Sequence, residues 1–508
     1  MKPVRLARDH RHITQRIIIK GTLILDTPTC LGSGDIEGVT DMMLIRDSIS
    51  DHALLTGASI AGALRNYVHE YENGYGKQEK IEQLSTFLFG AVRRKDYKND
   101  DSDQSPRRDD KGDEGDQSPL IVHDSISSEV PTIELRDGVK IDSQTGTATD
   151  KAKYDLELLA AGTEFPLCFE LLLEKDHSQI KKALCIALQG LENKQISLGM
   201  KKRRGFGRCH VDKWEVWDFD LAQESDRIAW LTFERDWGKQ SAKAPQIGKI
   251  SEIFKINLST DDKRDRFTIH ATFNLASPLL IRSGQAETGI APDVVHLKSN
   301  RNGELKPVLS GTSLAGVLRH RAERIVNTLD ISTTIVDDIF GPDFSKDKTK
   351  QAKASRLVVH ESEIDNTTDL VQTRIAIDRF TGGAYPGALF QEQPIFPQGE
   401  KNLEINLELR SPQEHEIGLL LLLLKDLWTE DLPVGGAISV GRGRLKGIEA
   451  ILTLQQKDKH QKWRIFQNDA QLKVENIEQV NLSEQQVKEE LQKYVSELVD
   501  YTMKRDHE

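Results

Sequence analysis

The sequence predicts a mixed α+β protein made of two tandem copies of one folding unit, and three observations lead to this prediction. The chain has 508 residues, which is more than one hydrophobic core usually serves. Short motifs occur twice in the same order, beginning with LTGASIAGALR at residues 55–65 and LSGTSLAGVLR at 309–319. Each copy also opens with a strand and a helix and closes with a strand, a helix and a strand, which is the order of a ferredoxin-like unit.

Four further pairs of segments follow the first pair in the same order. They are LFGA (88–91) with IFGP (339–342), SPLIVHDSIS (118–127) with SRLVVHESEI (355–364), IDSQTGTA (141–148) with IDRFTGGA (377–384), and GMKKRRGFGR (199–208) with GGAISVGRGR (435–444). The separation within a pair drops once, so the first copy contains one insertion between Gly90 and Ser118. This insertion, at about residues 93–117, is dense in charges and nearly free of apolar residues, and we expect it to be disordered.

The opening strand of each copy is RIIIKGTLIL (16–25) or FTIHATFNL (267–275), and the second of these alternates apolar and polar residues as a half-buried strand does. The repeated GxSxxGxLR segment then starts a helix, with Ser59 and Ser313 as the expected N-caps. One face of the first helix carries Ile60, Leu64, Tyr67 and Tyr71.

Each copy closes with a strand (165–173 and 403–410), a helix (179–192 and 415–428), a glycine-rich loop and a last strand. This order predicts a ferredoxin-like α+β unit with long insertions.

The predicted boundaries place the first domain at 1–216, a linker at 217–265, the second domain at 266–454 and a C-terminal helical tail at 455–508. In the tail, EQQVKEELQKYVSELVDY has the pattern of an amphipathic helix that could pack on a partner.

Composition and charge predict a globular protein of the cytoplasm, with no membrane attachment. The longest apolar run, from Ile417 to Leu424, is too short to cross a bilayer, and the N-terminal segment lacks the apolar core of a signal peptide. The four cysteines lie far apart, which indicates neither a zinc site nor a disulfide framework and fits a reducing compartment. A net charge of −11 argues weakly against nucleic-acid binding by the whole surface, but not against a local basic groove.

The repeated GxSxxGxLR segment first suggests a phosphate-binding loop. However, Ala63 and Val317 stand where such a loop requires lysine, so we do not expect it to bind a nucleoside triphosphate. One interpretation is that the small residues let a helix lie close to a sheet. Another is that the helix N-terminus holds an RNA phosphate. The residues beside that phosphate would be Ser59, Arg65, Ser313 and Arg319.

The late glycine-rich loop gathers basic residues. In the first copy these are Lys201, Lys202, Arg203, Arg204 and Arg208. Phe206 offers a stacking face and the glycines let the backbone approach a ligand closely, a combination that suits single-stranded or A-form RNA. The second copy retains Arg442 and Arg444. A solvated basic turn is the alternative, but recurrence in an acidic protein favours RNA.

Each copy also has one acid in an uncharged loop ahead of GxSxxGxLR. Asp41 lies in GVTDMML (38–44) and Asp293 in GIAPDVVHL (289–297). An isolated acid is often a cap or turn residue. Beside an RNA groove it could instead bind a divalent cation or orient an attacking hydroxyl.

Other acids and two histidines compete for a catalytic role. Asp142 and Asp378 lie in the IDxxTG loops, and we expect them to shape those loops. His123 and His360 each end an apolar run and precede an acid, so each is either a general base or a strand-end histidine held by packing, and we favour packing. The sequence contains no Ser–His–Asp arrangement, HExxH motif or nucleotide-binding fingerprint.

Together, in order and twice over, these motifs resemble those of the RAMP superfamily, and more narrowly the backbone subunit of type III CRISPR effector complexes. The resemblance covers about residues 16–216 and 266–450. Two fused copies are similar to the double-backbone protein of the D-subtype complexes. The resemblance implies two modified RRM-like ferredoxin domains that hold a CRISPR guide RNA beside the other subunits of the complex.

The resemblance also implies roles for individual residues. The regions 141–148 and 377–384 match a thumb-like hairpin that pushes between guide and target bases, where Arg379 would meet RNA. Asp41 and Asp293 match the catalytic aspartate, which would cleave single-stranded target RNA with the help of a divalent metal ion, Mg²⁺ or Mn²⁺. The 2′-hydroxyl of the target would be the nucleophile, so one aspartate and nearby cations would suffice.

Two alternatives remain open at this point. One is a non-catalytic scaffold that binds guide RNA in the same way. The other is a metal-independent nuclease that processes guide RNA through His123 or His360. The second copy lacks the KKRR cluster and Pro292 stiffens the loop of Asp293, so either copy could be a non-cleaving spacer.

Overall fold

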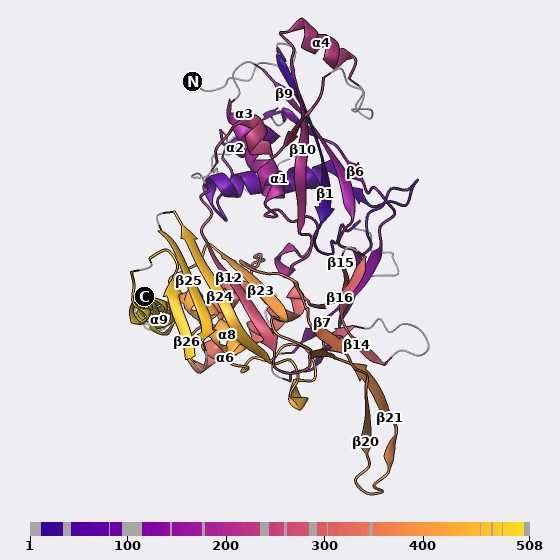
Figure 1. Ribbon diagram of the computed structural model, residues 1–508, viewed down its shortest axis with the longest axis vertical. Coiled ribbons are helices and arrows are strands. Elements are labelled where there is room, and N and C mark those ends of the chain that lie inside the picture. Colours follow the sequence, from indigo (N-terminus) through magenta and orange to yellow (C-terminus); the bar gives the residue numbers. More distant parts are fainter. Residues whose placement is uncertain are drawn as a thin grey trace, which may run out of the picture.

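The computed structural model describes residues 12–33, 42–80, 82–93, 114–142, 145–174, 178–233, 243–258, 262–283, 292–301, 303–344, 349–457, 459–468, 471–479 and 481–501. Two domains lie end to end along the long axis of the molecule. The first is at the top of Figure 1 in indigo to magenta, and the second lies below it in orange to yellow. No helix within the described ranges is long and apolar enough to cross a membrane.

The first domain is built on an antiparallel sheet with the strand order β11-β10-β1-β9-β5. Its main elements are β1 (Gln15–Leu25), β2 (Leu54–Leu55), α1 (Gly57–Asn73), α2 (Leu84–Phe89), β5 (Leu120–Val122), β6 (Ser125–Ile126), β9 (Glu164–Leu173), α3 (Ser178–Glu192), β10 (Cys209–Asp220), α4 (Glu224–Leu231), β11 (Gln246–Gly248) and α5 (Ile250–Phe254). The order β10-β1-β9-β5, with helices after β1 and β9, is that of a ferredoxin-like fold.

The second domain repeats this plan, and its sheet has the order β17-β23-β12-β24-β25-β26. The elements are β12 (Arg266–Leu275), β13 (Arg282–Ser283), β14 (Val294–His296), β15 (Lys298–Arg301), β16 (Glu304–Leu309), α6 (Gly311–Thr328), α7 (Thr334–Phe340), β17 (Leu357–Val359), β18 (Ser362–Glu363), β19 (Thr367–Asp369), β22 (Ile395–Pro397), β23 (Leu403–Arg410), α8 (Glu414–Trp428), β24 (Leu445–Gln456), β25 (Lys459–Asn468), β26 (Gln471–Asn476) and α9 (Glu484–Asp500). The order β24-β12-β23-β17 matches β10-β1-β9-β5 strand for strand. The prediction of tandem ferredoxin-like domains is therefore confirmed.

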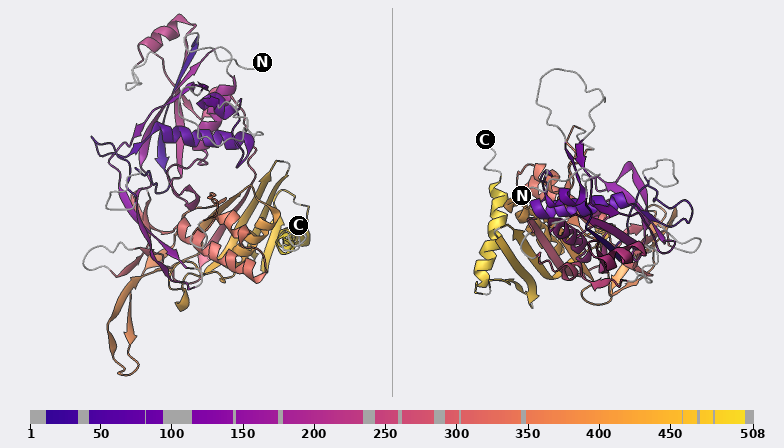
Figure 2. Two further views of the ribbon diagram at one scale, coloured as in Figure 1. Left: turned by 180° about the vertical axis from the view of Figure 1, so that it is seen from behind. Right: turned by 90° about the horizontal axis from the view of Figure 1, so that it is seen from above.

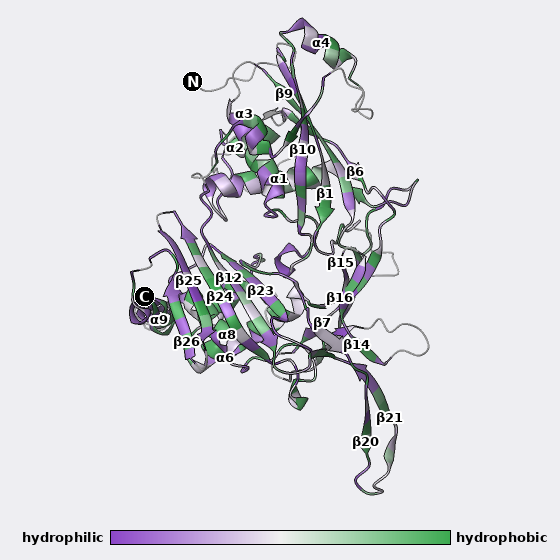
Figure 3. Cartoon of the chain, in the orientation of Figure 1, coloured by the Kyte–Doolittle hydropathy of each residue, from purple (hydrophilic) through white to green (hydrophobic). Residues whose placement is uncertain are grey.

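The cores lie between each sheet and the helices that cover one of its faces, which Figure 2 shows from behind and from above. Alternate residues of β1, such as Ile17, Ile19 and Leu23, are at most 1% exposed and join the core of the first domain. Ile18 points to the opposite face, where it packs with Trp217. The same alternation of hydrophilic and hydrophobic residues runs along β23, β24 and β25 (Figure 3). Each fully buried Ile or Leu stabilises the fold by about 1.5–3 kcal/mol.

The N-caps of α1 and α6 lie three residues before the serines that we expected to cap these helices. Thr56 and Ser310 are the N-caps, and their hydroxyl oxygens accept hydrogen bonds from the backbone N–H groups of Ser59 (3.3 Å) and Ser313 (3.2 Å). The prediction of Ser59 and Ser313 as N-caps is therefore wrong, because a hydroxyl reaches the N–H group of the third helical residue. The expected face of α1 is confirmed, since its apolar residues are all buried: Ile60, Leu64, Tyr67 and Tyr71.

Two hairpins contain the IDxxTG motifs. The first comprises β7 (Ile133–Ile141) and β8 (Ala148–Leu159), and it runs down to the second domain (Figure 1), where Glu134 of β7 accepts a hydrogen bond from Ser299 of β15. The second comprises β20 (Gln372–Ile377) and β21 (Ala384–Gln393), and it projects away from the body of the molecule. Equivalent hairpins thus have different surroundings.

The insertion of the first copy lies largely outside the described residues. The ends of the predicted segment are strands, because β3 (Ala91–Arg93) pairs with β4 (Glu114–Asp116). The prediction of disorder between them concerns residues that are not described.

Two predicted segments contain more structure than we expected. The linker includes β11, which pairs with β10 through Ile247 and Glu215, so this part belongs to the first sheet. The tail includes β25 and β26, which extend the second sheet. The amphipathic helix is confirmed as α9, but it packs on α8 of its own domain, where a Cβ atom on Gly418 would lie 2.2 Å from the carbonyl oxygen of Tyr494.

Candidate nucleic-acid interface

The two glycine-rich loops have the same backbone conformation. Gly207 and Gly443 have φ angles of +77° and +79°, and a Cβ atom on them would lie 1.8 Å from the carbonyl oxygen of Leu198 and 1.9 Å from that of Val434. Each loop also contains a short 3₁₀ helix, η2 (Lys202–Arg204) or η4 (Ile438–Val440). These glycines therefore bring the loop close to its own backbone. This corrects the expectation that they serve the approach of a ligand.

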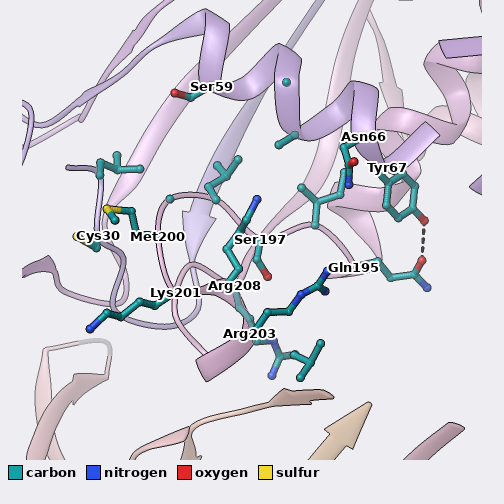
Figure 4. A pocket seen from close by; sticks show the side chains of 18 of the residues that line it. Cys30, Ser59, Asn66, Tyr67, Gln195, Ser197, Met200, Lys201, Arg203 and Arg208 are labelled. Atoms are coloured by element: carbon teal, nitrogen blue, oxygen red, sulfur yellow. Dashed lines mark hydrogen bonds between the residues drawn. The ribbon is translucent and has the colours of Figure 1, made fainter. Parts of the chain in front are cut away.

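A cavity of about 950 Å³ lies between α1, the glycine loop of the first domain and β23 of the second domain. Figure 4 shows Ser59, Asn66 and Tyr67 of α1 on one side, and Lys201, Arg203 and Arg208 of the loop on the other. The lining includes many basic residues from three segments of the chain: Lys194, Lys201, Lys202, Arg203, Arg208, Arg264, Arg266 and Arg410. Its acids are Glu70 and Glu408. The cavity therefore has an excess of positive charge.

Two cations of the cavity, Lys202 and Arg203, have no carboxylate at ion-pair distance among the described residues. Partial burial and the neighbouring Arg410 guanidinium lower the pKa of Arg203, which shows that its charge stands in an unfavourable environment. Lys201 lies over the ring of Tyr154, with its Nζ atom 3.7 Å from the ring centroid. Phosphate groups would relieve the repulsion between these cations.

The second glycine of the first GxSxxGxLR segment, Gly62, is not required by packing within the protein. Gly57 and Gly311 are confined by packing, because a Cβ atom on either would lie 2.3 Å from a carbonyl oxygen. Gly62 lines the cavity, and a Cβ atom there would meet no atom within 4 Å. Glycine in a helix interior costs about 0.5–1 kcal/mol relative to alanine. Close approach by something outside the chain would account for a glycine at this position.

Two residues that we expected to meet RNA are buried. Phe206 is 3% exposed and packs with Cys30, Leu156 and Leu158, so the prediction that it offers a stacking face is wrong. Arg442 is also 3% exposed and forms an ion pair with Glu392 at 2.7 Å, which removes it from the surface. In both cases the alternating glycines turn the intervening side chain inward.

Other predicted RNA-binding residues have partners within the protein. Arg204 donates hydrogen bonds to the carbonyl oxygen of Phe340 (3.3 Å) and the hydroxyl of Ser355 (3.5 Å), both in the second domain. Arg65 is paired with Glu79 at 2.8 Å, and Arg319 with Asp337 at 2.7 Å.

The remaining predicted residues are accessible to different degrees. Ser59, Arg379 and Arg444 are exposed, while Arg208 and Ser313 are half-buried. Ser59 and Arg208 lie in the cavity wall, and Arg379 lies at the tip of hairpin β20–β21. Their contact with RNA stays a prediction.

The residues that follow the two candidate catalytic aspartates form equivalent contacts. Asp41 is outside the described residues, but the next residue, Met42, forms a parallel bridge with Leu156 of β8. Val294, which follows Asp293, pairs in the same way with Glu392 of β21. Asp293 is exposed, and its Oδ2 atom accepts a hydrogen bond from the backbone N–H of Gln391 at 2.7 Å.

The described residues contain no group of three or more His, Cys, Asp or Glu side chains arranged to hold a metal ion. A single exposed carboxylate such as that of Asp293 can still fit Mg²⁺, which usually keeps several waters and is bound by one or two carboxylates together with substrate phosphates. The role of Asp293 as a metal ligand stays a prediction.

The rival acids bind backbone groups of their own loops. Asp378 accepts hydrogen bonds from the backbone N–H groups of Thr381 (3.0 Å) and Phe380 (2.7 Å), which lower its pKa, and Asp142 accepts one from that of Thr145 (2.8 Å). Both acids shape their loops as expected. Burial, together with the Arg208 charge, lowers the pKa of His360 to about 4, so this histidine is neutral at pH 7.

The junction between the domains contains residues that sequence reasoning missed. Glu361 is fully buried and binds two arginines, Arg136 of hairpin β7–β8 (2.9 Å) and Arg301 of β15. Nearby in β15, the hydroxyl group of Ser299 and the backbone N–H group of Asn300 donate hydrogen bonds to the carboxylate of Glu134. Arg264 lies over Tyr67 of α1, 4.5 Å from its ring centroid. The run KRDR at 263–266 was the available signal for the cationic residues of the linker.

Comparison with known proteins agrees with this architecture. A search among curated proteins finds no match. The family profile of the RAMP superfamily matches residues 22–210 and 272–446, one segment in each domain and together more than half of the chain. The paired glycine loops fall within these segments, as do the main helices α1, α3, α6 and α8 of the two ferredoxin-like units. The chain therefore belongs to the RAMP superfamily and contains two tandem RAMP regions.

Proposed function

We propose that this protein is an RNA-binding backbone subunit of a type III CRISPR ribonucleoprotein, which holds guide RNA and cleaves complementary target RNA at one site per active domain. The observation that carries the proposal is the basic cavity between α1 and the glycine loop. Its exposed Lys202 and half-buried Arg203 form no ion pair with any residue that the structure describes, and Gly62 leaves its wall open. RNA of the guide is a polyanion that matches this surface in charge.

The junction between the two domains supports a stacking role. In this chain η2 of the first domain lies against α6 and β17 of the second, and a Cβ atom on Gly311 would lie 2.3 Å from the carbonyl oxygen of Arg204. The equivalent η4 of the second domain exposes Ile438 (45%) and Val440 (55%). We propose that η4 and hairpin β20–β21 meet another subunit of the complex as η2 and hairpin β7–β8 meet the second domain.

The proposed cleavage depends on an aspartate held beside the hairpin. The Gln391 N–H group fixes one carboxylate oxygen of Asp293, and its exposed side chain is accessible to a target strand that the hairpin distorts. A divalent cation held by Asp293 and the phosphate would stabilise the negative charge that develops there. The 2′-hydroxyl of a displaced nucleotide would attack the adjacent phosphorus, and the 5′-oxygen of the next nucleotide would leave as a hydroxyl group. This gives a 2′,3′-cyclic phosphate, so DNA, which lacks the 2′-hydroxyl, would not be cut.

The test uses the reconstituted ribonucleoprotein with end-labelled target RNA. We expect Asp41→Ala and Asp293→Ala each to abolish one defined cut while target binding is retained. Asp431→Ala is the matched control, because this exposed acid of the same domain lies outside the hairpin and binds its neighbours Thr429 and Lys425. If cutting is unchanged in both aspartate variants, the protein is a non-catalytic scaffold. If precursor guide RNA is cut in EDTA and cutting stops in His123→Ala or His360→Ala, it is a processing nuclease.

The RNA-binding part of the proposal has its own test. We expect Lys202→Ala/Arg203→Ala to weaken guide-RNA binding by the full chain and to reduce its dependence on salt concentration. Lys213→Ala is the control, because Lys213 is an exposed cation of β10 that does not line the cavity. Unchanged binding in the double variant would exclude the cavity as the guide-RNA site.

A further inference from the structure

We infer that Arg442 and Glu392 are positioning residues that connect the glycine loop, hairpin β20–β21 and Asp293 of the second domain. The inference rests on the proposed function of Asp293. It gives a structural role to Arg442, which the loop motif had predicted to bind RNA but which is buried.

The contact at the base of the hairpin is a buried polar cluster. The Nη2 atom of Arg442 donates to Glu392 Oε1 at 2.7 Å and to Gln372 Oε1 at 2.6 Å. The side chains of Arg442 and Glu392 are 4% and 2% exposed. Arg374, which is more exposed, binds the same carboxylate. One arginine of the glycine loop therefore holds both strands of the hairpin, since Gln372 belongs to β20 and Glu392 to β21.

The β21 strand also contacts the segment that contains Asp293, at Gln391 and Glu392. Val294 pairs with Glu392 in the parallel contact between β14 and β21. The N–H group that binds the Asp293 carboxylate belongs to Gln391, the residue beside Glu392. A shift of Glu392 would therefore move both the strand pairing and the hydrogen bond that orient Asp293.

The first domain has an apolar contact at the equivalent place. Phe206 occupies in GFGR the position that Arg442 has in GRGR, and Leu156 of β8 corresponds to Glu392. Leu156 forms the parallel bridge with Met42, the residue after Asp41. Phe206 and Leu156 belong to one buried cluster. The two copies thus make the same connection with opposite chemistry, one apolar and one ionic.

The difference between the Phe206–Leu156 and Arg442–Glu392 contacts indicates that this position requires a matched pair of side chains. A buried ion pair adds little stability compared with well-packed apolar side chains of similar size, but a single unpaired member is strongly unfavourable. A matched pair at this place, of either chemistry, would hold the hairpin and the aspartate segment together. A mismatched pair would release them.

The experiment transfers the apolar pair of the first domain into the second. The variants are Arg442→Phe, Glu392→Leu and the double variant Arg442→Phe/Glu392→Leu, with Arg442→Lys as a milder change that keeps the charge. Each is assembled into the ribonucleoprotein, and single-turnover cleavage is measured separately at each cut. Hydrogen exchange of the full chain without RNA follows the peptide that contains Gln391.

We expect each single variant to slow the cut that depends on Asp293 by about 10- to 100-fold, because a small displacement of a catalytic group has effects of this size. The cut that depends on Asp41 and the affinity for target RNA should not change. Exchange at Gln391 should become faster. The double variant should restore the rate and the exchange, which loss of a merely stabilising ion pair would not do.

Two results would overturn the inference. One is an unchanged rate and unchanged exchange in Arg442→Phe and Glu392→Leu. The other is a double variant that is as slow as the single variants and exchanges as fast. Failure of the proposed function is seen separately, as cutting that persists in Asp293→Ala, and the exchange measurement still decides whether the pair holds Gln391.

Discussion

Removal of the Glu361 carboxylate is the sharpest test of how the two domains are joined. The Glu361 side chain has no exposed surface, and the Arg136 and Arg301 side chains that it binds are 5% and 6% exposed. Glu361→Ala would leave two buried guanidinium groups without their shared carboxylate. Breaking a buried ion pair in this way typically costs about 3–5 kcal/mol. For a domain of about 150–250 residues each kcal/mol lowers Tm by about 2–4 °C, so we expect a decrease of roughly 6–20 °C for the second domain.

The assay is calorimetry of the full chain, together with limited proteolysis of hairpin β7–β8. The control is Asp343→Ala, which removes an exposed partner of Lys140 on the same hairpin, and exposed pairs contribute only about 0–1 kcal/mol. Glu361→Ala should lower the Tm and make the hairpin sensitive to protease, whereas Asp343→Ala should do neither. If Glu361→Ala melts like the unmodified protein and its hairpin resists protease, the buried cluster does not hold the domains together.

Three further predictions concern pH, salt and backbone shape. Burial raises the pKa of Glu361, but the Arg136 and Arg301 charges outweigh it and lower the pKa overall. Its contribution to stability should therefore be present above the unfolded value of about 4.3 and disappear as the pH falls below it, and acid unfolding of Glu361→Gln should show a weaker pH dependence. In guide-RNA titrations, Lys202→Ala/Arg203→Ala should reduce the slope of log K against log salt by about 1.4, since each phosphate contact to a single strand contributes about 0.7, and an unchanged slope would count against phosphate contacts. Gly62→Ala should stabilise the fold by up to about 1 kcal/mol in urea unfolding, because nothing lies near the added methyl group, yet weaken guide-RNA binding. Gly207→Ala should destabilise the fold instead, because its Cβ atom would collide with the carbonyl oxygen of Leu198, and equal RNA affinity in Gly62→Ala would show that RNA does not approach α1.

The main strands and helices of both ferredoxin-like units could be predicted from the sequence because each element occurs twice. A pattern seen in one copy could be checked against the other. The strand at 403–410 and the helix at 415–428 agree with β23 (Leu403–Arg410) and α8 (Glu414–Trp428) within one residue. Periodicity is a reliable signal when an element is long and half-buried. Segments outside the repeated sequence motifs, such as β11 and β26, could not be checked against the other copy and were assigned to a linker and a tail.

The candidate site was less predictable, because motif spacing does not reveal the direction of a side chain in a tight loop. Phe206 and Arg442 lie between glycines with positive φ angles, which turn both side chains inward. The caps were misplaced for a similar reason, since Thr56 and Ser310 act on a residue three positions later. The partners of Glu361 come from β7 and β15, far apart in the sequence, so no local pattern could bring Arg136 and Arg301 together.

The charged character of the junction between the domains follows from the covalent link between them. Two separate proteins that associate lose translational and rotational freedom, and apolar surface usually compensates for that loss. Here each domain meets its neighbour at a high effective concentration, because both belong to one chain. A contact built from Arg136, Glu361 and Arg301 can therefore determine orientation without having to supply affinity. The exposed Ile438 and Val440 of η4 have the apolar character that a contact with a separate chain would need.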